Sequence, residues 1–305
     1  MNVAIHAQNL GLASAVISAI GNDERGQKLI QILQERGVNT DLITINEHPT
    51  GTVTVDTTNP SEVHYTIDEP SAWDFIGSTA ISWEPGDLLL HGSLATRNKN
   101  SFDALNVLRA QATMRVFDLN LRAPFIDQER ILALLDGTEI VKVNEEEYAL
   151  LRQWLELDAT PEQGFRQLHA RFGTQHLILT LGSKGALWIT TADKLRSKTF
   201  KIKVKDTVGA GDSFIAAMLF GISHLLEPQQ TIDYAAALGA MVASREGANP
   251  VISKTELKAF RSFKPIIVTT SSASPGSTVR QGKSGWPRPV IGSIATNGAS
   301  AGRNT

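Results

Sequence analysis

Apolar residues recur along the chain in two patterns, one typical of amphipathic helices and the other of short buried strands. The first pattern predicts a helix over residues 2–15, with Gly11 as its stop. A strand over 15–20 and a helix over 24–35 come next, and Gly37 is expected to cap that helix. The chain therefore opens in an α–β–α order.

Strands and longer helices alternate again from about residue 87. Strands are predicted over 88–92, 114–118, 140–143, 176–180 and 186–190. Helices are predicted over 100–112, 127–136, 145–154, 161–172, 211–226 and 231–245. Repeated units of this kind favour an α/β fold, in which helices cover both faces of a central, mostly parallel sheet.

Two segments depart from this pattern. Residues 42–67 contain three short β-branched runs, over 42–45, 51–56 and 63–67, and they predict a small antiparallel flap. Residues 264–305 are rich in Ser, Thr, Gly, Pro and Ala, with little periodicity. This composition predicts a mostly disordered tail, so that the domain covers residues 1–263.

Composition excludes several classes of protein. The 305 residues are 42% hydrophobic and carry a net charge of −2, which favours one sizeable core and no general nucleic-acid or anionic membrane surface. The absence of cysteine excludes disulfides, thiolate catalysis and Cys-ligated metals, and it fits a cytoplasmic enzyme. No run of about 18 apolar residues is present, so no membrane span is expected.

The segment with the clearest chemistry is the heptad over residues 206–212, D-T-V-G-A-G-D, which precedes an apolar helical run. Gly209 and Gly211 let main-chain N–H groups approach an anion, and the following helix adds its positive N-terminal end. Asp212 then lies beside this anion site, where its carboxylate can accept a proton from a hydroxyl group. The alternative is a tight turn in which Asp212 only caps a helix.

The heptad closely resembles the signature of the ribokinase-like, or PfkB, family of carbohydrate kinases, and the resemblance extends over residues 2–262. It implies a three-layer α/β sandwich with a small β lid, here the flap. It also implies transfer of phosphate from ATP to a sugar hydroxyl, with Asp212 as catalytic base. The developing negative charge would be stabilised by the backbone of Gly209, Ala210 and Gly211.

Further motifs follow the family's order and imply the nucleotide side of the site. Asn144 and Glu147 match N-x-x-E, which organises Mg²⁺ and the ATP phosphates in that family. Thr180, Gly182 and Gly185 match T-L-G-x-x-G, which borders the nucleotide. The alternatives are a solvated acidic helix start and an ordinary strand-to-hairpin turn.

The resemblance also implies a monovalent cation, with K⁺ as the candidate. The first acid of the heptad, Asp206, commonly helps to hold that cation in the family, and Val208 and Gly247 are assigned to the same site.

The D-x-N-x-R segment over residues 118–122 resembles that of fructokinases and 2-keto-3-deoxygluconate kinases, and it assigns Asn120 and Arg122 to the sugar. Because this segment follows a strand, its polar groups are expected at the carboxyl edge of the sheet. A structural turn with a surface arginine is the alternative. The sugar could also be ribose or a nucleoside, and the lid could form a homodimer contact.

One block of the family pattern, G-E-x-x-I-D followed by G-G-x-x-x-N-x-A, is not matched. Only Asn2, assigned to the sugar, remains from it. This predicts an N-terminally truncated domain that lacks its first strand, or a non-catalytic descendant. A dinucleotide oxidoreductase is disfavoured, because no G-x-G-x-x-G follows an early strand.

Overall fold

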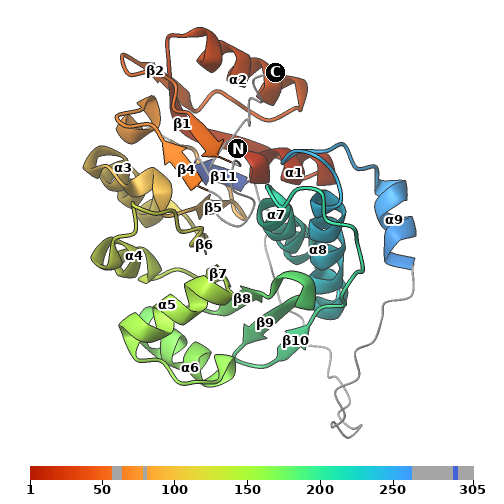
Figure 1. Ribbon diagram of the computed structural model, residues 1–305. Coiled ribbons are helices and arrows are strands. Elements are labelled where there is room, and N and C mark those ends of the chain that lie inside the picture. The colour runs from red at the N-terminus through yellow and green to blue at the C-terminus, as the bar shows by residue number, and fades with distance from the viewer. Residues whose placement is uncertain (57–63, 78–80, 263–290, 295–305) are drawn as a thin grey trace, which may run out of the picture.

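A computed structural model describes residues 1–56, 64–77, 81–262 and 291–294. Most of its strands join one sheet, in which β2, β1, β11, β5, β6, β7 and β8 run parallel (Figure 1). At its end, β9 is antiparallel to β8, and β10 is antiparallel to β9. Its order is β10 (Lys194–Arg196), β9 (Ala186–Thr190), β8 (His176–Thr180), β7 (Ile140–Asn144), β6 (Arg115–Asp118), β5 (Leu88–His91), β11 (Ile291–Ile294), β1 (Ser14–Gly21) and β2 (Ile43–Asn46).

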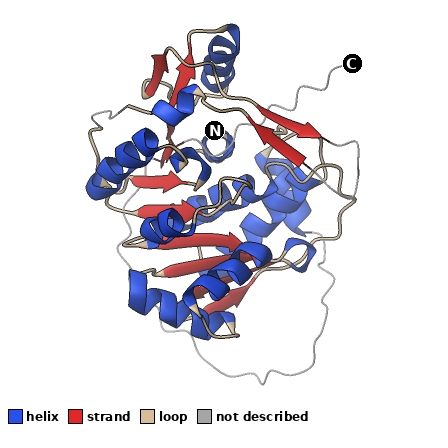
Figure 2. Cartoon of the chain, turned by 60° about the vertical axis from the view of Figure 1, so that its left-hand side comes forward, coloured by secondary structure: helices blue, strands red, loops and turns tan. Residues whose placement is uncertain are grey.

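Successive residues of each buried strand point to opposite faces of the sheet, so each face is apolar and is covered by helices (Figure 2). Leu88 and Leu90 lie in one core cluster and Leu89 lies in the other. The first face is covered by α1 (Asn2–Leu10), α7 (Ala210–Ser223) and α8 (Pro228–Ala243), and the second by α3 (Lys99–Gln111), α4 (Gln128–Leu135), α5 (Glu145–Leu155) and α6 (Pro161–Phe172). The predicted α/β fold with a central, mostly parallel sheet is confirmed.

The predicted elements agree with the structure in kind and differ mainly at their ends. The first helix ends at Leu10, before Gly11, whose φ of 97° is the left-handed conformation that glycine favours. One helix and two strands were not predicted, namely α9 (Lys254–Ser262), β10 and β11. In the part of the chain that the structure describes, no helix is long and apolar enough to cross a membrane.

The predicted flap needs one correction. Residues 43–46 belong to the main sheet, where β2 pairs in parallel with β1. Only β3 (Val53–Asp56) and β4 (His64–Ile67) form the antiparallel pair, and we call these two strands the lid. Short β-branched runs look alike in a hairpin and at the edge of a sheet, so the pattern could not separate them.

The lid is anchored to the α/β body through apolar contacts. Ile67 is 8% exposed and packs in a small cluster with Trp73 and Leu94. In the α/β body, Arg97 forms a buried ion pair with Asp74, at 2.7 Å from Nε to Oδ1. These contacts fix where the lid meets the body.

The predicted tail needs correcting at four residues. Residues 291–294, which the sequence assigned to the tail, form β11 and lie between β1 and β5. Ile291 pairs with Ser14 on one side and with Leu88 on the other. The rest of the predicted disordered tail lies outside the described residues.

Stability is expected to fall in acid because of a buried histidine. His91, at the end of β5, is fully buried and stacks on Phe117 with ring centroids 4.9 Å apart. Burial, with a smaller contribution from Arg109, lowers the pKa of His91 from 6.5 to about 3. Below pH 6.5 the unfolded chain therefore binds a proton that the folded chain does not, and stability is lost as the pH falls towards 3.

For His91 alone this loss amounts to about 2 kcal/mol between pH 7 and pH 5. Urea unfolding at the two pH values should show it. In His91→Leu, the loss between these pH values should be smaller by about that amount. An unchanged pH dependence in this variant would contradict a neutral, buried His91.

Candidate active site

The glycine turn begins α7 at the carboxyl edge of the sheet. Gly209 has φ of 79°, and a Cβ atom on it would lie 2.3 Å from the carbonyl oxygen of Ala248, so only glycine fits there. Ala210 and Gly211 are the first residues of the helix, and Asp212 follows in its first turn. The first N–H groups of a helix have no partner within it, and they carry the positive end of its dipole. This geometry supports the predicted anion site, and the binding of an anion there stays a prediction.

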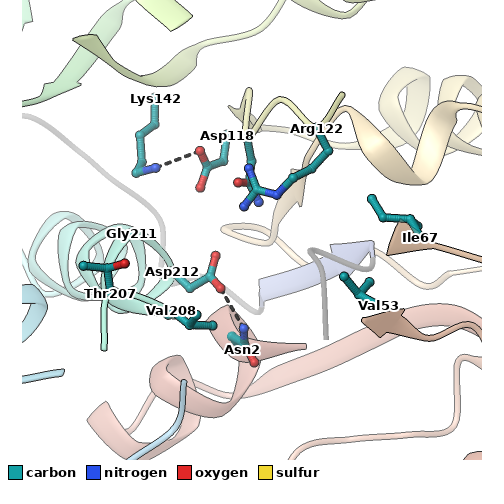
Figure 3. A pocket seen from close by; sticks show the side chains of 12 residues that line it. Asn2, Val53, Ile67, Asp118, Arg122, Lys142, Thr207, Val208, Gly211 and Asp212 are labelled. Atoms are coloured by element: carbon teal, nitrogen blue, oxygen red, sulfur yellow. Dashed lines mark hydrogen bonds and ion pairs between the residues drawn. The ribbon is translucent and has the colours of Figure 1, made fainter. Parts of the chain in front are cut away.

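Asp212 is held by a chain of side-chain amides. Asn2 Nδ2 donates to Asp212 Oδ2 at 2.8 Å, and Asn249 Nδ2 donates to Asn2 Oδ1 at 2.8 Å. Asn2 is 2% exposed, so its position is fixed by packing. The other oxygen of Asp212 points into a cavity (Figure 3).

That cavity, which we call the inner pocket, has a volume of about 210 Å³. Asp212 lies on one side of it and Arg122 on the other, while Val53 and Ile67 of the lid form a further wall (Figure 3). Its lining residues are Asn2, Val53, Ile67, Asp118, Asn120, Arg122, Lys142, Thr207, Val208, Gly209, Gly211 and Asp212. The structure therefore brings all three residues assigned to the sugar together with the assigned base.

The loop after β6 places the polar side chains of this pocket. Asn120 has φ of 43°, a left-handed conformation that asparagine tolerates better than most residues. Leu121 N donates to Glu147 Oε1 at 2.9 Å, and this hydrogen bond ties the loop to the start of α5. Arg122 can meet a phosphate or sugar oxygen from this position.

Sequence reasoning did not single out the buried ion pair in this pocket. Lys142 Nζ and Asp118 Oδ1 are 2.8 Å apart, and the two side chains are 7% and 2% exposed. Burial raises the pKa of Asp118 to about 6. Burial acts to lower the pKa of Lys142, but the carboxylates around it outweigh this and raise it. A lysine between the apolar residues of strand β7 was the available signal.

A second cavity, which we call the outer pocket, has a volume of about 790 Å³ and lies on the other side of the glycine turn. Four of the residues assigned to the nucleotide line it: Asn144, Thr180, Gly182 and Gly185. Thr207 and Gly211 line both pockets. The two cavities therefore meet at the turn that carries Asp212.

Glu147 lies outside both pockets, although it was assigned to the nucleotide. Its Oε2 accepts from Asn144 N at 2.8 Å, while Asn144 Oδ1 accepts from Glu147 N at 2.8 Å. This reciprocal capping box begins α5, and the other oxygen of Glu147 holds Leu121. The structure thus gives Glu147 a positioning role between the two pockets, and its part in binding Mg²⁺ stays a prediction.

The three residues assigned to a monovalent cation lie together. Asp206 Oδ1 accepts from Val208 N at 2.9 Å, and Asp206 Oδ2 accepts from Gly247 N at 3.1 Å. Asp206 therefore joins the glycine turn to the loop after α8. Within the described ranges, no group of three or more acidic or histidine side chains could hold a metal ion by itself.

Comparison with known proteins identifies the family of this chain. The model of the family described as pfkB family carbohydrate kinase matches residues 1–255. The chain belongs to the pfkB family of carbohydrate kinases. This membership, predicted from the heptad and the motifs around it, is confirmed.

Fructokinases are among the relatives of this pfkB chain. The fructokinase of Escherichia coli is 28% identical over 265 residues, which cover 81% of this chain and 85% of the relative. A crystal structure of fructokinase from Vibrio cholerae, with fructose, ADP and calcium bound, is 28% identical with a TM-score of 0.73. That match covers 85% of this chain and 89% of the other.

The ribokinase-like fold is confirmed as well. The structure of a ribokinase II from E. coli, in complex with ATP and Mg²⁺, gives a TM-score of 0.74 at 20% identity, over 85% of this chain and 86% of the other. At this identity the likeness concerns the fold alone.

Proposed function

We propose that this pfkB chain transfers the γ-phosphoryl group of ATP to a hydroxyl group of fructose. One observation carries the proposal: a pocket of sugar size and a larger pocket meet at the glycine turn, beside Asp212. Fructokinases are among the relatives, and one related structure holds fructose and ADP. In this arrangement ATP would occupy the outer pocket and the sugar the inner pocket.

The reaction follows from these positions. The sugar oxygen forms a bond to the γ-phosphorus as the bond from that phosphorus to the β–γ bridging oxygen breaks, and ADP leaves. Asp212 accepts the hydroxyl proton through the oxygen that faces the pocket. The N–H groups of the turn stabilise the charge on the transferred group.

Magnesium fits the edge of the outer pocket. Asn144, Glu145 and Glu146 line this pocket and bring oxygen donors of the kind that Mg²⁺ prefers, directly or through water. The ion would neutralise charge on the ATP phosphates. A K⁺ ion at Asp206, Val208 and Gly247 belongs to the same proposal. It is supported by the two hydrogen bonds of Asp206, from Val208 N and from Gly247 N, which hold the three residues together.

The size of the inner pocket favours a single sugar. Its 210 Å³ is below the roughly 300–1,000 Å³ of pockets for drug-sized ligands, which argues against a nucleoside. An assay of ADP release with fructose, ribose, 2-keto-3-deoxygluconate and a nucleoside tests the choice. Turnover is expected with fructose; turnover of another of these compounds and none of fructose would contradict it.

The same assay, combined with calorimetry, separates an active kinase from a non-catalytic descendant. A descendant would bind ATP in calorimetry and release no ADP with any of the four compounds. A homodimer through the lid and a cytoplasmic location stay predictions, and light scattering of the purified chain measures the first of them.

A further inference from the structure

Lys142 lies at the place where the two pockets meet. Its Nζ is 3.4 Å from the point that a Cβ atom on Gly211 would occupy, and Gly211 lines both pockets. In Figure 3 its ammonium group lies opposite the carboxylate of Asp212, across the inner pocket. The side chain reaches this point from β7, on the face of the sheet that α7 covers.

The groups around the Lys142 ammonium group carry more negative than positive charge. Three carboxylates act on the ammonium group, those of Asp118, Glu147 and Asp212, and only Asp118 is hydrogen-bonded to it. A phosphate that entered this space would meet repulsion from them and needs a cation within contact distance. Lys142 and Arg122 are the two cationic side chains among the residues that line the inner pocket, and Lys142 is the one beside Gly211.

Stability gives little reason for a charge at this position. A buried ion pair is often no more stabilising than apolar residues of similar volume, because two charges must leave water. Residue 211 is also a glycine, and a Cβ atom on it would lie 3.4 Å from Nζ, so its absence leaves room beside the ammonium group. Both points favour a ligand for this group.

We propose that Lys142 is a further catalytic residue, whose ammonium group contacts the phosphoryl group as it passes from the nucleotide to the sugar, and that Asp118 is the positioning residue that holds it. This inference rests on the proposed kinase function. Before transfer, Asp118 fixes Nζ at the border of the two pockets. During transfer, the fixed positive charge offsets the charge that develops on the phosphoryl oxygens.

The first test is Lys142→Met, which keeps the length of the side chain and removes its charge. We expect kcat with fructose to fall by about 10²-fold, the scale of one lost charge-stabilising group. Affinity for ADP should stay within about twofold, whereas affinity for a non-hydrolysable ATP analogue should fall about tenfold, because only the analogue has the γ-phosphate. Lys99→Met is the matched control, since Lys99 forms an exposed ion pair with Asp103 on α3.

A second variant guards against misfolding, because Lys142→Met leaves Asp118 buried without its partner. In Lys142→Met/Asp118→Asn the carboxylate that was paired with Lys142 is replaced by a neutral amide, and the same separation between ADP and the analogue is expected. A kcat within threefold of the parent in a folded variant would overturn the inference, and so would equal losses of affinity for the two nucleotides. If the parent shows no turnover with any sugar, the proposed function fails instead.

Discussion

Asp212→Asn is expected to reduce kcat by about 10²-fold or more with ATP affinity nearly unchanged, the scale of a lost general base. The amide keeps the size of the side chain and can still accept the hydrogen bond that Asn2 donates to Oδ2. It cannot take the proton of the sugar hydroxyl. Steady-state kinetics with fructose and calorimetry with ATP measure the two quantities.

Asp103→Asn is the matched control, because Asp103 forms an exposed ion pair on α3, away from both pockets. This control should keep the parent's kcat. Equal turnover in Asp212→Asn and the parent would remove Asp212 from the mechanism. A parallel loss of ATP affinity would instead indicate that Asp212 holds the glycine turn together.

Removal of β11 is expected to destabilise the whole domain. A chain that ends after residue 290 lacks β11, so β1 and β5 each present an unpaired edge inside the sheet. A backbone hydrogen bond contributes about 0.5–1.5 kcal/mol, and β11 has two partner strands. The total is several kcal/mol, a large share of the roughly 5–15 kcal/mol that stabilises a domain.

The control for this deletion is a chain that ends after residue 294, which keeps β11 and removes only residues 295–305. Thermal unfolding should give a clearly lower Tm, or aggregation, for the chain ending at 290 alone. Equal midpoints for the two shortened chains would show that β11 does not hold the sheet together.

The sequence was sufficient for the fold class and the glycine turn, because both depend on local patterns. Apolar alternation specified strands and helices to within a few residues, since each element must bury one face. The heptad indicated a tight glycine turn, and the structure agrees because only glycine permits the backbone of Gly209, where a Cβ atom would meet Ala248. Asp212 follows directly from that turn.

The tertiary structure decided the contacts between segments far apart in the chain. Asn2 and Asp212 are 210 residues apart and share a hydrogen bond, while Lys142 meets Asp118 across two neighbouring strands. The partners in these contacts could not be predicted, because a single polar residue in an apolar element has many potential partners. Gly292 and Ser293 have low strand propensity, so β11 could not be predicted from residues 264–305. A strand of this kind forms only because the edges of β1 and β5 supply the backbone partners that its own sequence cannot specify.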